Sequence, residues 1–501
     1  MATEREVKLA APDDFEFPDL SAVAPGIVPG SPVTQDLTAV YFDTDDLEFA
    51  RTGVTLRHRT GEPGPPWTLK LPQETGAPAL VRRELHFDGP PDSVPSGAAD
   101  VVRVYVRSRP LLPVVRLRTI RSAIVWQDAA GRPVVEVVDD AVKAYKGKRL
   151  IQRFREIEVE LRTDDRRGAR VLRDVVDRLV TAGCRADPPI PKAIRSLGRR
   201  ALAPPAVVVP DVDSDATMTQ LAHHALARSV SQIMRHDPGV RLGDYPEDVH
   251  QFRVGTRRLR SDLRTFANLF EPDWVASLRG ELAWVGGEIG SVRDIDVLIN
   301  RLRSQAMTLP ESDAAAIAQL LERLGDQRDR QWTTALDALR SPRYDALIDA
   351  LVDAACRPPF RDNDANGLAR KQVAPLVRRQ WRRLVRGVNA LGDDPPDDAL
   401  HHVRILAKRC RYAAEAATPS VGKQAARFAA AVANLQTVLG DHQDTVVAEA
   451  WLRDAAAATP DIGVVAGELI AIQRAERARL RESWPEAWEA ASAKELRRWL
   501  R

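Results

Sequence analysis

The stretch "VHQFRVGTRRLRSDLRTF", residues 249–266, has the periodicity that decides how the second half of the chain folds. Its basic residues recur at steps of three or four, so an α-helix would place them on one face: His250, Arg253, Arg257, Arg260 and Arg264. A second stripe, displaced around the helix, is apolar: Phe252, Leu259, Leu263, Phe266 and Phe270. The stretch therefore predicts an amphipathic helix whose polar side is almost entirely positive.

A second copy of this helix follows about 150 residues later, in "LHHVRILAKRCRYAAEAA" at residues 400–417. Its basic residues keep the same steps: His401, Arg404, Lys408 and Arg411. Like charges at this spacing lower the stability of a helix, so acids of the fold or an external polyanion must offset them. A solvated face with no ligand is the alternative, and the histidine in both copies favours an anion site.

A further pair of motifs shows that the repetition is not limited to one helix. "EIGSVRDIDVL" at 288–298 resembles "TVLGDHQDTVV" at 437–447, aligning Gly290 with Gly440. His250 precedes Asp294 by 44 residues, and His401 precedes Asp444 by 43. Near-equal spacing of two separate motifs predicts an internal duplication, in which the two basic helices would occupy comparable positions.

The first part of the chain, up to about residue 200, has a different period. Short segments such as "VTLRHR" at 54–59 and "WTLKLP" at 67–72 alternate apolar and charged residues, as strands do, and Gly and Pro separate them. The Pro-rich segment "ALAPPAVVVPDVDSDA" divides the two patterns. We therefore expect a strand domain over 1–200, a linker over 201–216 and a helical domain over 217–500.

Composition limits the classes of protein that fit. The chain has 501 residues and a net charge of only +3, which excludes a chain that is basic throughout. Its three cysteines lack metal-ligand spacing and fit a reducing compartment. The segment "MATEREVKLA" has no apolar signal core, and no apolar run is long enough to span a bilayer. We expect a cytoplasmic protein without a membrane partner.

The strands of the first domain carry rows of charge on one face. Acids and bases recur at every second position: Glu4, Glu6 and Lys8; Arg57 and Arg59; Arg82 and Glu84; Arg116 and Arg118; Glu136 and Asp140; and Glu156, Glu158 and Glu160. A solvated sheet face is one interpretation. If the strands close into a barrel, the rows would instead line its interior and suit a phosphate polyanion with divalent cations.

In this order the charged motifs resemble the CYTH domain of the triphosphate tunnel metalloenzymes. The matching segments are "EREVK" at 4–8, "YFDT" at 41–44, "LRHR" at 56–59, "TLK" at 68–70, "RRE" at 82–84, "RLRTIR" at 116–121, "EVVDD" at 136–140, "EIEVEL" at 156–161 and "PK" at 191–192. The resemblance implies an eight-stranded antiparallel barrel around a tunnel. It also implies hydrolysis of a triphosphate with Mg²⁺ or Mn²⁺.

The resemblance also implies roles for individual residues. Those at the reaction centre would be Glu4, Glu6 and Lys8, and the metal ligands would be Glu4, Glu6, Asp140, Glu156 and Glu158. The phosphate cradle would consist of Lys8, Arg57, Arg59, Lys70, Arg82, Arg116, Arg118 and Lys192. Which carboxylate would activate the water is left open.

The helical motifs resemble the CHAD domain, a duplicated histidine-containing helical bundle found beside CYTH. The resemblance rests on "VHQFRVGTRRLR", "SVRDIDVL", "LHHVRILAKRCRY" and "VLGDHQD". It implies binding of inorganic polyphosphate and association with polyphosphate granules. By motif, the binding residues would be His250, Arg253, Arg257, Arg258, Arg260, His401, Arg404, Lys408, Arg409 and Arg411.

Taken together, these patterns predict an α+β chain of two domains. A triphosphate tunnel barrel would precede an all-α duplicated bundle, and the favoured function is metal-dependent hydrolysis of inorganic triphosphate with polyphosphate bound by the helices. A non-catalytic polyphosphate-binding protein is the alternative. Adenylate cyclase chemistry ranks lower because no segment indicates an adenine pocket. Nucleic acid is disfavoured because few aromatic residues lie among the arginines.

Overall fold

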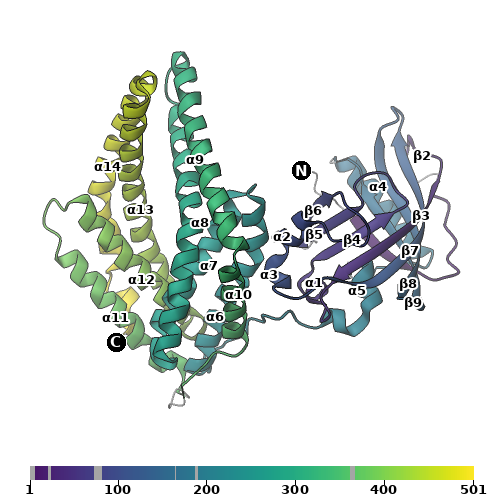
Figure 1. The fold of residues 1–501 in the computed structure, drawn as a ribbon, viewed down its shortest axis with the longest axis horizontal. Helices are drawn as coiled ribbons and strands as arrows, with labels where there is room; N and C mark the ends of the chain where they lie inside the picture. Colours follow the sequence, from purple (N-terminus) through teal and green to yellow (C-terminus); the bar gives the residue numbers. More distant parts are fainter. Residues whose placement is uncertain are drawn as a thin grey trace. The chain divides into compact units, whose positions relative to one another are not determined.

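The computed structural model describes residues 6–20, 24–72, 82–163, 165–186, 190–361 and 367–500. The chain divides into two compact units, Met1–Ala206 and Val207–Arg501. The first is built on an antiparallel sheet and the second is helical (Figure 1), which confirms the expected fold class. None of the described helices is both long and apolar enough to cross a membrane.

The sheet of the first unit contains ten strands in the described residues, where the sequence predicted eight. They are β1 (Glu6–Ala11), β2 (Ile27–Pro29), β3 (Val33–Asp43), β4 (Thr55–Thr60), β5 (Trp67–Pro72), β6 (Arg82–Phe87), β7 (Leu112–Asp128), β8 (Pro133–Lys146), β9 (Arg149–Leu161) and β10 (Arg185–Ala186). The order is β10-β1-β9-β8-β7-β3-β4-β5-β6, and β2 pairs with β7. The additional strands are the short β2 and β10, so the difference from eight is small.

The two faces of this sheet differ in what covers them. The outer face packs against α4 (Arg166–Thr181), whose Val171, Val175 and Leu179 join a core with the sheet residues Val137 and Ile157. The inner face is defined here as the opposite one. It holds a second apolar cluster that includes Ala193 of α5 (Lys192–Leu197). Because neighbouring residues of a strand point to opposite faces, every charged row belongs to one face or the other.

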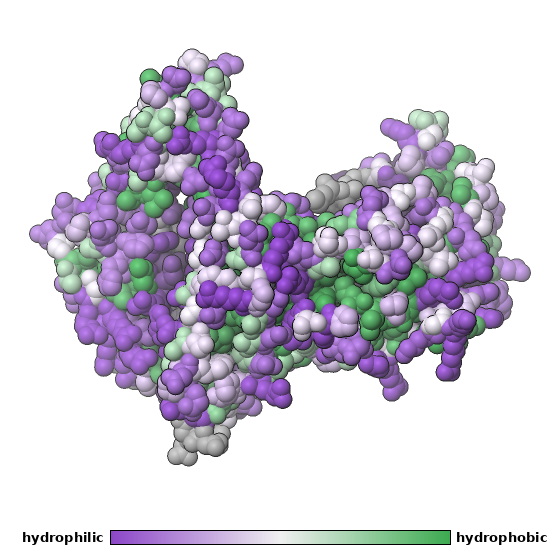
Figure 2. Space-filling model, in the orientation of Figure 1, coloured by the Kyte–Doolittle hydropathy of each residue, from purple (hydrophilic) through white to green (hydrophobic). Residues whose placement is uncertain are grey.

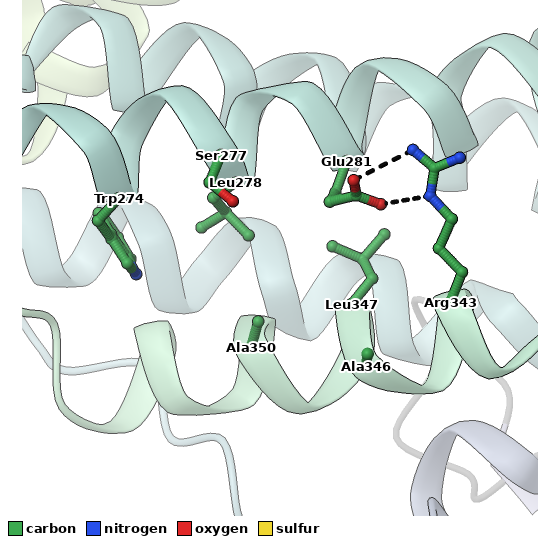
Figure 3. Close-up of a pocket in the computed structure, with 8 residues that line it drawn as sticks. All are labelled: Trp274, Ser277, Leu278, Glu281, Arg343, Ala346, Leu347 and Ala350. Carbon is green, nitrogen blue, oxygen red and sulfur yellow. Dashed lines mark hydrogen bonds and ion pairs between the residues drawn. The ribbon is translucent and has the colours of Figure 1, made fainter.

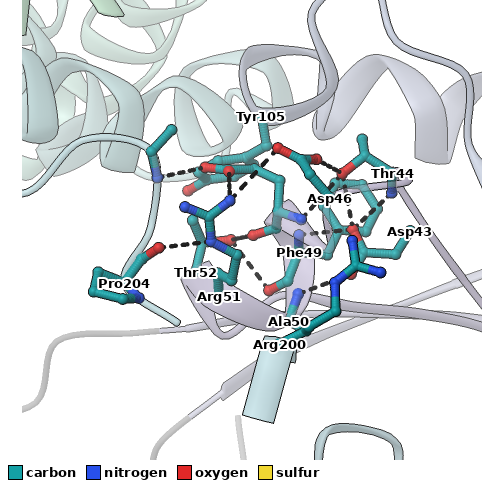
Figure 4. A network of polar contacts seen from close by, with 12 residues as sticks. Asp43, Thr44, Asp46, Phe49, Ala50, Arg51, Thr52, Tyr105, Arg200 and Pro204 are labelled. Atoms are coloured by element: carbon teal, nitrogen blue, oxygen red, sulfur yellow. Dashed lines mark hydrogen bonds and ion pairs between the residues drawn. The ribbon is translucent and has the colours of Figure 1, made fainter. Parts of the chain in front are cut away.

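The remaining elements of the first unit are α1 (Glu48–Thr52), α2 (Ser96–Val101), α3 (Arg103–Val106) and the 3₁₀ segment η1 (Gly198–Leu202). A polar network holds α1 (Figure 4). The backbone N–H groups of Phe49 and Ala50 donate to the buried carboxylate of Asp43, at 2.8 and 3.0 Å. Arg51 of the same helix donates to the carbonyl of Pro204 at 2.6 Å. The "DT" of the "YFDT" motif therefore has a structural role, since it anchors the helix onto which residues 204–206 fold.

The second unit consists of long helices: α6 (Met218–Leu242), α7 (Pro246–Thr265), α8 (Pro272–Ala306), α9 (Ala314–Arg340), α10 (Pro342–Cys356), α11 (Ala369–Asn389), α12 (Asp397–Val421), α13 (Lys423–Ala458) and α14 (Gly463–Ala491). Short 3₁₀ segments join them or end the chain: η2 (Ala267–Leu269), η3 (Glu311–Asp313), η4 (Pro460–Ile462) and η5 (Glu495–Leu500). Hydrophilic side chains predominate on the face of this unit visible in Figure 2, as expected for amphipathic helices packed on a common core.

The duplication is present in the order and lengths of these helices. Helix α7 is followed by the 35-residue α8, and α12 by the 36-residue α13. Successive helices pack in the same sequence in both halves, from α6 to α9 and from α11 to α14, and α10 follows the first set. Helix α7 packs against α12, so the two basic helices of the repeat face one another.

Candidate functional site

A compact group of ion pairs lies on the inner face of the sheet. Lys8 of β1 lies 2.8 Å from Glu158 and 3.3 Å from Glu6. Lys192, the first residue of α5, contacts Asp140 and lies 3.1 Å from Glu158. The alternation of β1, β8 and β9 therefore brings the predicted carboxylates and two predicted lysines together.

Two further contacts complete this group, which we call the carboxylate cluster. Arg121 of β7 forms a two-pronged ion pair with Asp140, with N–O distances of 2.8 and 2.7 Å. The ammonium of Lys192 lies 3.3 Å from Glu156, whose Oε1 atom is buried and makes no hydrogen bond. The carboxylate cluster thus comprises Glu6, Asp140, Glu156 and Glu158 with their cations Lys8, Arg121 and Lys192.

The charges of this cluster shift one another's protonation. Burial raises the pKa of Glu158, but Lys192 and Lys8 outweigh that effect and hold it well below its usual range. Burial has the larger effect at Glu156, where the pKa is raised even though Lys192 opposes it. Burial lowers the pKa of Lys192, but the surrounding carboxylates raise it further, so the ammonium stays charged at neutral pH. The cluster therefore contains one firmly ionised acid beside one that is easier to protonate.

Strands β3 to β6 add basic residues to the same face. Arg57 donates to the hydroxyl of Tyr41 at 3.4 Å, and Lys70 lies 2.7 Å from Glu84. Arg59 pairs with Glu62. The Nε atoms of Arg57 and Arg59 are buried and have no hydrogen-bond partner. These arginines retain unused donors of the kind that bind phosphate oxygens.

The structure places two of the predicted cradle residues on the other face of the sheet. Arg116 and Arg118 lie on the outer face and are exposed; Arg118 pairs with Asp36 at 2.6 Å, and Arg116 lies over the ring of Tyr145. Arg121, three residues beyond Arg118, has the opposite parity and points inward to Asp140. The sequence does not distinguish the inward from the outward arginines, because both faces of β7 carry them and the motif "RLRTIR" contains all three.

The other predicted residues of the first unit are placed as follows. Glu4 lies outside the described residues. Arg82 is opposite Pro72 in the β5–β6 ladder, and its side chain is not described. Glu136 and Glu160 share the inner face with Glu158, but both pair with Arg162.

The divalent metal implied by the resemblance would need oxygen ligands, and the carboxylate cluster supplies them. The buried Glu156 Oε1 atom, which makes no hydrogen bond and faces the Lys192 ammonium at 3.3 Å, is a donor of the right type. Among the described residues, however, no three Asp, Glu, His or Cys side chains are gathered as a metal ion would require. The donor chemistry fits Mg²⁺ or Mn²⁺, while cations of the chain itself separate the donors.

In the second unit, the predicted basic residues of α7 and α12 form what we call the α7–α12 cation cluster: Arg253, Arg257, Arg404 and Lys408. Burial, followed by the charges of Arg404, Arg257 and Arg253, lowers the pKa of Lys408 to about 7. Burial and the same crowding lower the pKa of Arg257. The Nε atoms of Arg257 and Arg404 are buried without a hydrogen-bond partner. Such crowding of cations, two of them with unsatisfied Nε atoms, is typical of an anion site.

The duplicated glycines seat two of these arginines. A Cβ atom on Gly290 would lie 3.3 Å from the guanidinium of Arg253, and one on Gly440 would lie 3.5 Å from that of Arg404. Arg253 also donates to the Gly290 carbonyl at 3.0 Å and pairs with Asp294 at 2.6 Å. In each repeat the aligned glycine therefore makes room for one arginine of the basic helix, Arg253 of α7 beside α8 and Arg404 of α12 beside α13.

The two histidines border this cluster. Burial and the neighbouring arginines lower the pKa of His250, and burial with Arg404 and Lys408 lowers that of His401. Both imidazoles are therefore neutral at pH 7. They add polar groups to the site, whereas its positive charge comes from the arginines.

Two other predicted binding residues, Arg258 and Arg411, share one acid of the fold. Arg258 lies 3.0 Å from Glu415, and Arg411 lies 2.6 Å from the same carboxylate. Arg258 also donates to Gln232 and Arg411 to Gln436. Through Glu415, Arg258 links α7 to α12, whereas Arg411 pairs within α12 and reaches Gln436 of α13. The sequence could not show this, since it depends on how the two helices pack.

Arg260 and Arg409 belong to a separate group of arginines at another part of the same helices. Burial, together with Arg409, Arg279, Arg260 and Arg383, lowers the pKa of Arg264 to about 10. Arg279 and Arg383 come from α8 and α11, so four helices contribute to this group. The sequence stripe contained Arg260 and Arg264 and the motif resemblance named Arg409, but neither indicated the arginines of the neighbouring helices.

A shallow pocket between α8 and α10 lies apart from these charges (Figure 3). Its lining is largely apolar, with Trp274, Leu278 and Leu347, and Arg343 pairs across it with Glu281 at 2.7 Å. None of the predicted site residues lines it. The chemistry of the helical unit is therefore concentrated on α7 and α12.

Comparisons with known proteins agree with this arrangement. The CYTH domain model matches residues 2–179, and the CHAD domain model matches residues 224–453. "Uncharacterized protein Rv2226" and "Uncharacterized protein MT2285", from two strains of Mycobacterium tuberculosis, are each 34% identical over 461 residues, which is 86% of this chain and 84% of theirs.

Two solved structures are also similar to part of the chain. "PptA from Streptomyces chartreusis" is 27% identical with a TM-score of 0.47, covering 55% of this chain and 100% of its own. The CHAD domain from the plant Ricinus communis is 28% identical with a TM-score of 0.47, covering 58% of this chain and 97% of its own. From the matched domain models and the M. tuberculosis relatives, the chain belongs to the family of proteins in which a CYTH domain, of the triphosphate tunnel metalloenzyme superfamily, is followed by a CHAD domain.

Proposed function

We propose that the first unit hydrolyses inorganic triphosphate with the help of Mg²⁺ or Mn²⁺. The observation that carries this proposal is the inner face of the sheet, where four carboxylates meet Lys8, Arg121 and Lys192 beside the free donors of Arg57 and Arg59. A receptor for anions alone gains nothing from buried carboxylates, which repel phosphate. Carboxylates together with arginines suit a phosphate chain and its metal.

In this proposal the residues of the chain divide into two groups. Arg57, Arg59 and Lys70 bind phosphate oxygens and stabilise the charge that grows on them during transfer to water. The carboxylates of Glu6, Asp140, Glu156 and Glu158 would hold the metal, and Glu4 is proposed as a further ligand by motif. The metal supplies Lewis-acid stabilisation of the phosphoryl oxygens. Glu156, whose pKa is raised, is the acid of the cluster best suited to accept a proton from water.

The test is phosphate release from inorganic triphosphate by the full-length chain, with and without Mg²⁺ or Mn²⁺. We expect metal-dependent release that falls about a hundredfold or more in Glu6→Ala. Cyclic nucleotide production from ATP is measured in parallel, because it would reveal cyclase chemistry in place of hydrolysis. If wild type releases phosphate equally fast with and without the metal, the proposal is rejected.

We propose that the second unit binds inorganic polyphosphate at the α7–α12 cation cluster. Arg253, Arg257, Arg404 and Lys408 come from both halves of the duplication, and burial followed by the charges of the three arginines lowers the pKa of Lys408. A polyphosphate chain would relieve the repulsion among these charges. Granule association would follow from such binding.

The binding proposal is tested by titrating the full-length chain with polyphosphate and with single-stranded RNA at the same salt concentration. We expect the site to prefer polyphosphate, because few aromatic side chains are available to stack on bases. Equal or tighter binding of RNA would redirect the proposal to nucleic acid.

A further inference from the structure

Lys192 occupies an unusual position for a residue expected to bind phosphate. Its ammonium faces three carboxylates at once, in contact with Asp140 and 3.1 and 3.3 Å from Glu158 and Glu156. Only 13% of its side chain is exposed. Lys192 therefore takes the place among these acids that a bound cation would need, and it leaves no donor pointing toward a phosphate.

The other two cations of the carboxylate cluster, Arg121 and Lys8, also pair with its acids. Arg121 is matched to Asp140 by two parallel N–H···O contacts, a fixed geometry that binds one carboxylate firmly. Lys8 bridges Glu6 and Glu158 along the sheet. Among the described residues, Lys192 is the cation that contacts Asp140, Glu156 and Glu158 together. Arg121 still contacts Asp140 and Glu158 when it leaves, so its departure removes the one charge shared by all three acids and makes room for a divalent ion beside them.

The anchoring of α5 allows the side chain to move without the helix. Ala193 packs in the apolar cluster of the inner face, and Ile194 packs with Leu47 and Ala50 in another core cluster. Lys192 itself carries a flexible four-carbon stem that ends in a single point charge. Rotation of that stem can withdraw the ammonium while the backbone stays in place.

We propose that Lys192 is a built-in counter-ion that competes with the divalent metal for Asp140, Glu156 and Glu158, and that metal binding releases its ammonium to the phosphate chain. This inference rests on the proposed function and adds that the metal binds before Lys192 contacts the phosphate chain. A divalent ion and an ammonium cannot share three carboxylates at these distances without strong repulsion, so one must leave. Before the metal binds, Lys192 is thus a positioning residue that holds the three carboxylates together. After the metal has displaced it, its ammonium can bind the triphosphate.

The test is calorimetric titration of Mn²⁺ into the full-length chain in the absence of triphosphate. Lys192→Met should bind Mn²⁺ about tenfold more tightly than wild type, since the competing charge is gone. Glu158→Gln should bind it more weakly. Lys70→Met is the matched control, because Lys70 pairs with Glu84 elsewhere on the same face, and we expect its Mn²⁺ affinity to equal that of wild type.

Mn²⁺ affinity of Lys192→Met equal to or weaker than that of wild type would overturn the competition. If wild type still hydrolyses triphosphate in that case, only this inference fails; if no variant binds Mn²⁺, the metal-dependent function fails with it. Should Lys192→Met not fold, Lys192→Gln replaces it. A crystal structure of wild type with Mn²⁺ decides the matter independently: Lys192 still within about 3.5 Å of these carboxylates would contradict the exchange.

Discussion

Arg258 of α7 and Glu415 of α12 form an ion pair of 3.0 Å that joins the two halves of the internal duplication. Arg411 binds the other side of the same carboxylate at 2.6 Å. Glu415 therefore neutralises two arginines at the interface where the α7–α12 cation cluster also lies. One half-buried acid, Glu415, therefore links the two basic helices through Arg258. Among the described residues, the cations of the α7–α12 cation cluster form no ion pair with it.

Replacing Glu415 by Gln should destabilise the helical unit. Both Arg258 and Arg411 would lose their counter-charge in a partly buried setting, and we expect the free energy of unfolding to fall by about 2 kcal/mol. Urea denaturation followed by circular dichroism measures this change. Arg343→Gln, which breaks the exposed pair with Glu281, is the control and should lower the free energy of unfolding by much less than Glu415→Gln does.

The pH dependence of that effect has a definite sign. Burial raises the pKa of Glu415, but Arg411 and Arg258 lower it further, so its folded pKa lies below its ordinary value. A depressed carboxyl pKa contributes stability above the unfolded pKa, about 4.3, and loses it as pH falls through the folded pKa. The difference in stability between wild type and Glu415→Gln should be constant near neutral pH and shrink in acid. A difference that grows in acid would contradict this account.

Binding of polyphosphate should weaken as pH rises through 7, because Lys408 has a pKa of about 7 and loses its charge there. A bound polyanion favours the charged ammonium and raises that pKa, so binding takes up a proton. We expect affinity to fall about fivefold between about pH 6.5 and pH 8.5. Lys408→Arg, which stays charged, should remove the slope and keep tight binding; a slope unchanged in this variant would exclude Lys408 as its source.

Removal of one free cation should weaken polyphosphate binding more than removal of a paired one. Arg257→Ala deletes a guanidinium whose Nε atom is buried and unsatisfied, and we expect about tenfold weaker binding or more. The polyphosphate affinity of Arg257→Ala should also depend less steeply on salt concentration than that of wild type, since fewer charges take part in binding. Arg343→Ala, far from the cluster in the chain and paired with Glu281, should bind like wild type. Equal losses in both variants would indicate unspecific attraction.

Much of this architecture could be predicted from the sequence because it follows from local period. Alternation in the first part and steps of three and four in the second predicted a sheet unit followed by a helical one, and two spaced motifs predicted the duplication. The same alternation put Glu6 and Lys8 on one side of their strand and Glu156 and Glu158 on one side of theirs, and the structure brings Lys8 to 2.8 Å from Glu158. These features depend on neighbours within one strand or helix, which a sequence displays directly.

The features that could not be predicted from the sequence are contacts between one strand or helix and another. Either face of β7 could have pointed inward, and the register with β8, which pairs Arg121 with Asp140, decides against Arg116 and Arg118. Arg258 and Arg411 look like binding residues until α7 and α12 pack around Glu415. The sequence also does not show that α5 directs Lys192, a predicted phosphate ligand, into the acids. Such pairings depend on tertiary packing and leave no periodic signal.

The correction on β7 can be tested with two arginines of the same strand. Arg121→Met removes the inward guanidinium bound to Asp140 and should lower kcat/KM for triphosphate about a hundredfold. Arg118→Met removes an outward, 58% exposed guanidinium and should leave kcat/KM unchanged. Steady-state phosphate release measures both. A loss in Arg118→Met with none in Arg121→Met would reverse the assignment of faces.

The central claim is that the carboxylate cluster serves metal-dependent triphosphate hydrolysis, and one measurement tests it most directly. Phosphate release is followed for wild type and Glu158→Gln with triphosphate, long-chain polyphosphate and ATP, each with Mg²⁺, with Mn²⁺ and with a chelator. We predict release from triphosphate by wild type that exceeds release from ATP, requires the metal and falls about a hundredfold in Glu158→Gln. Release that persists in chelator, or that is equal in wild type and Glu158→Gln, would contradict the claim.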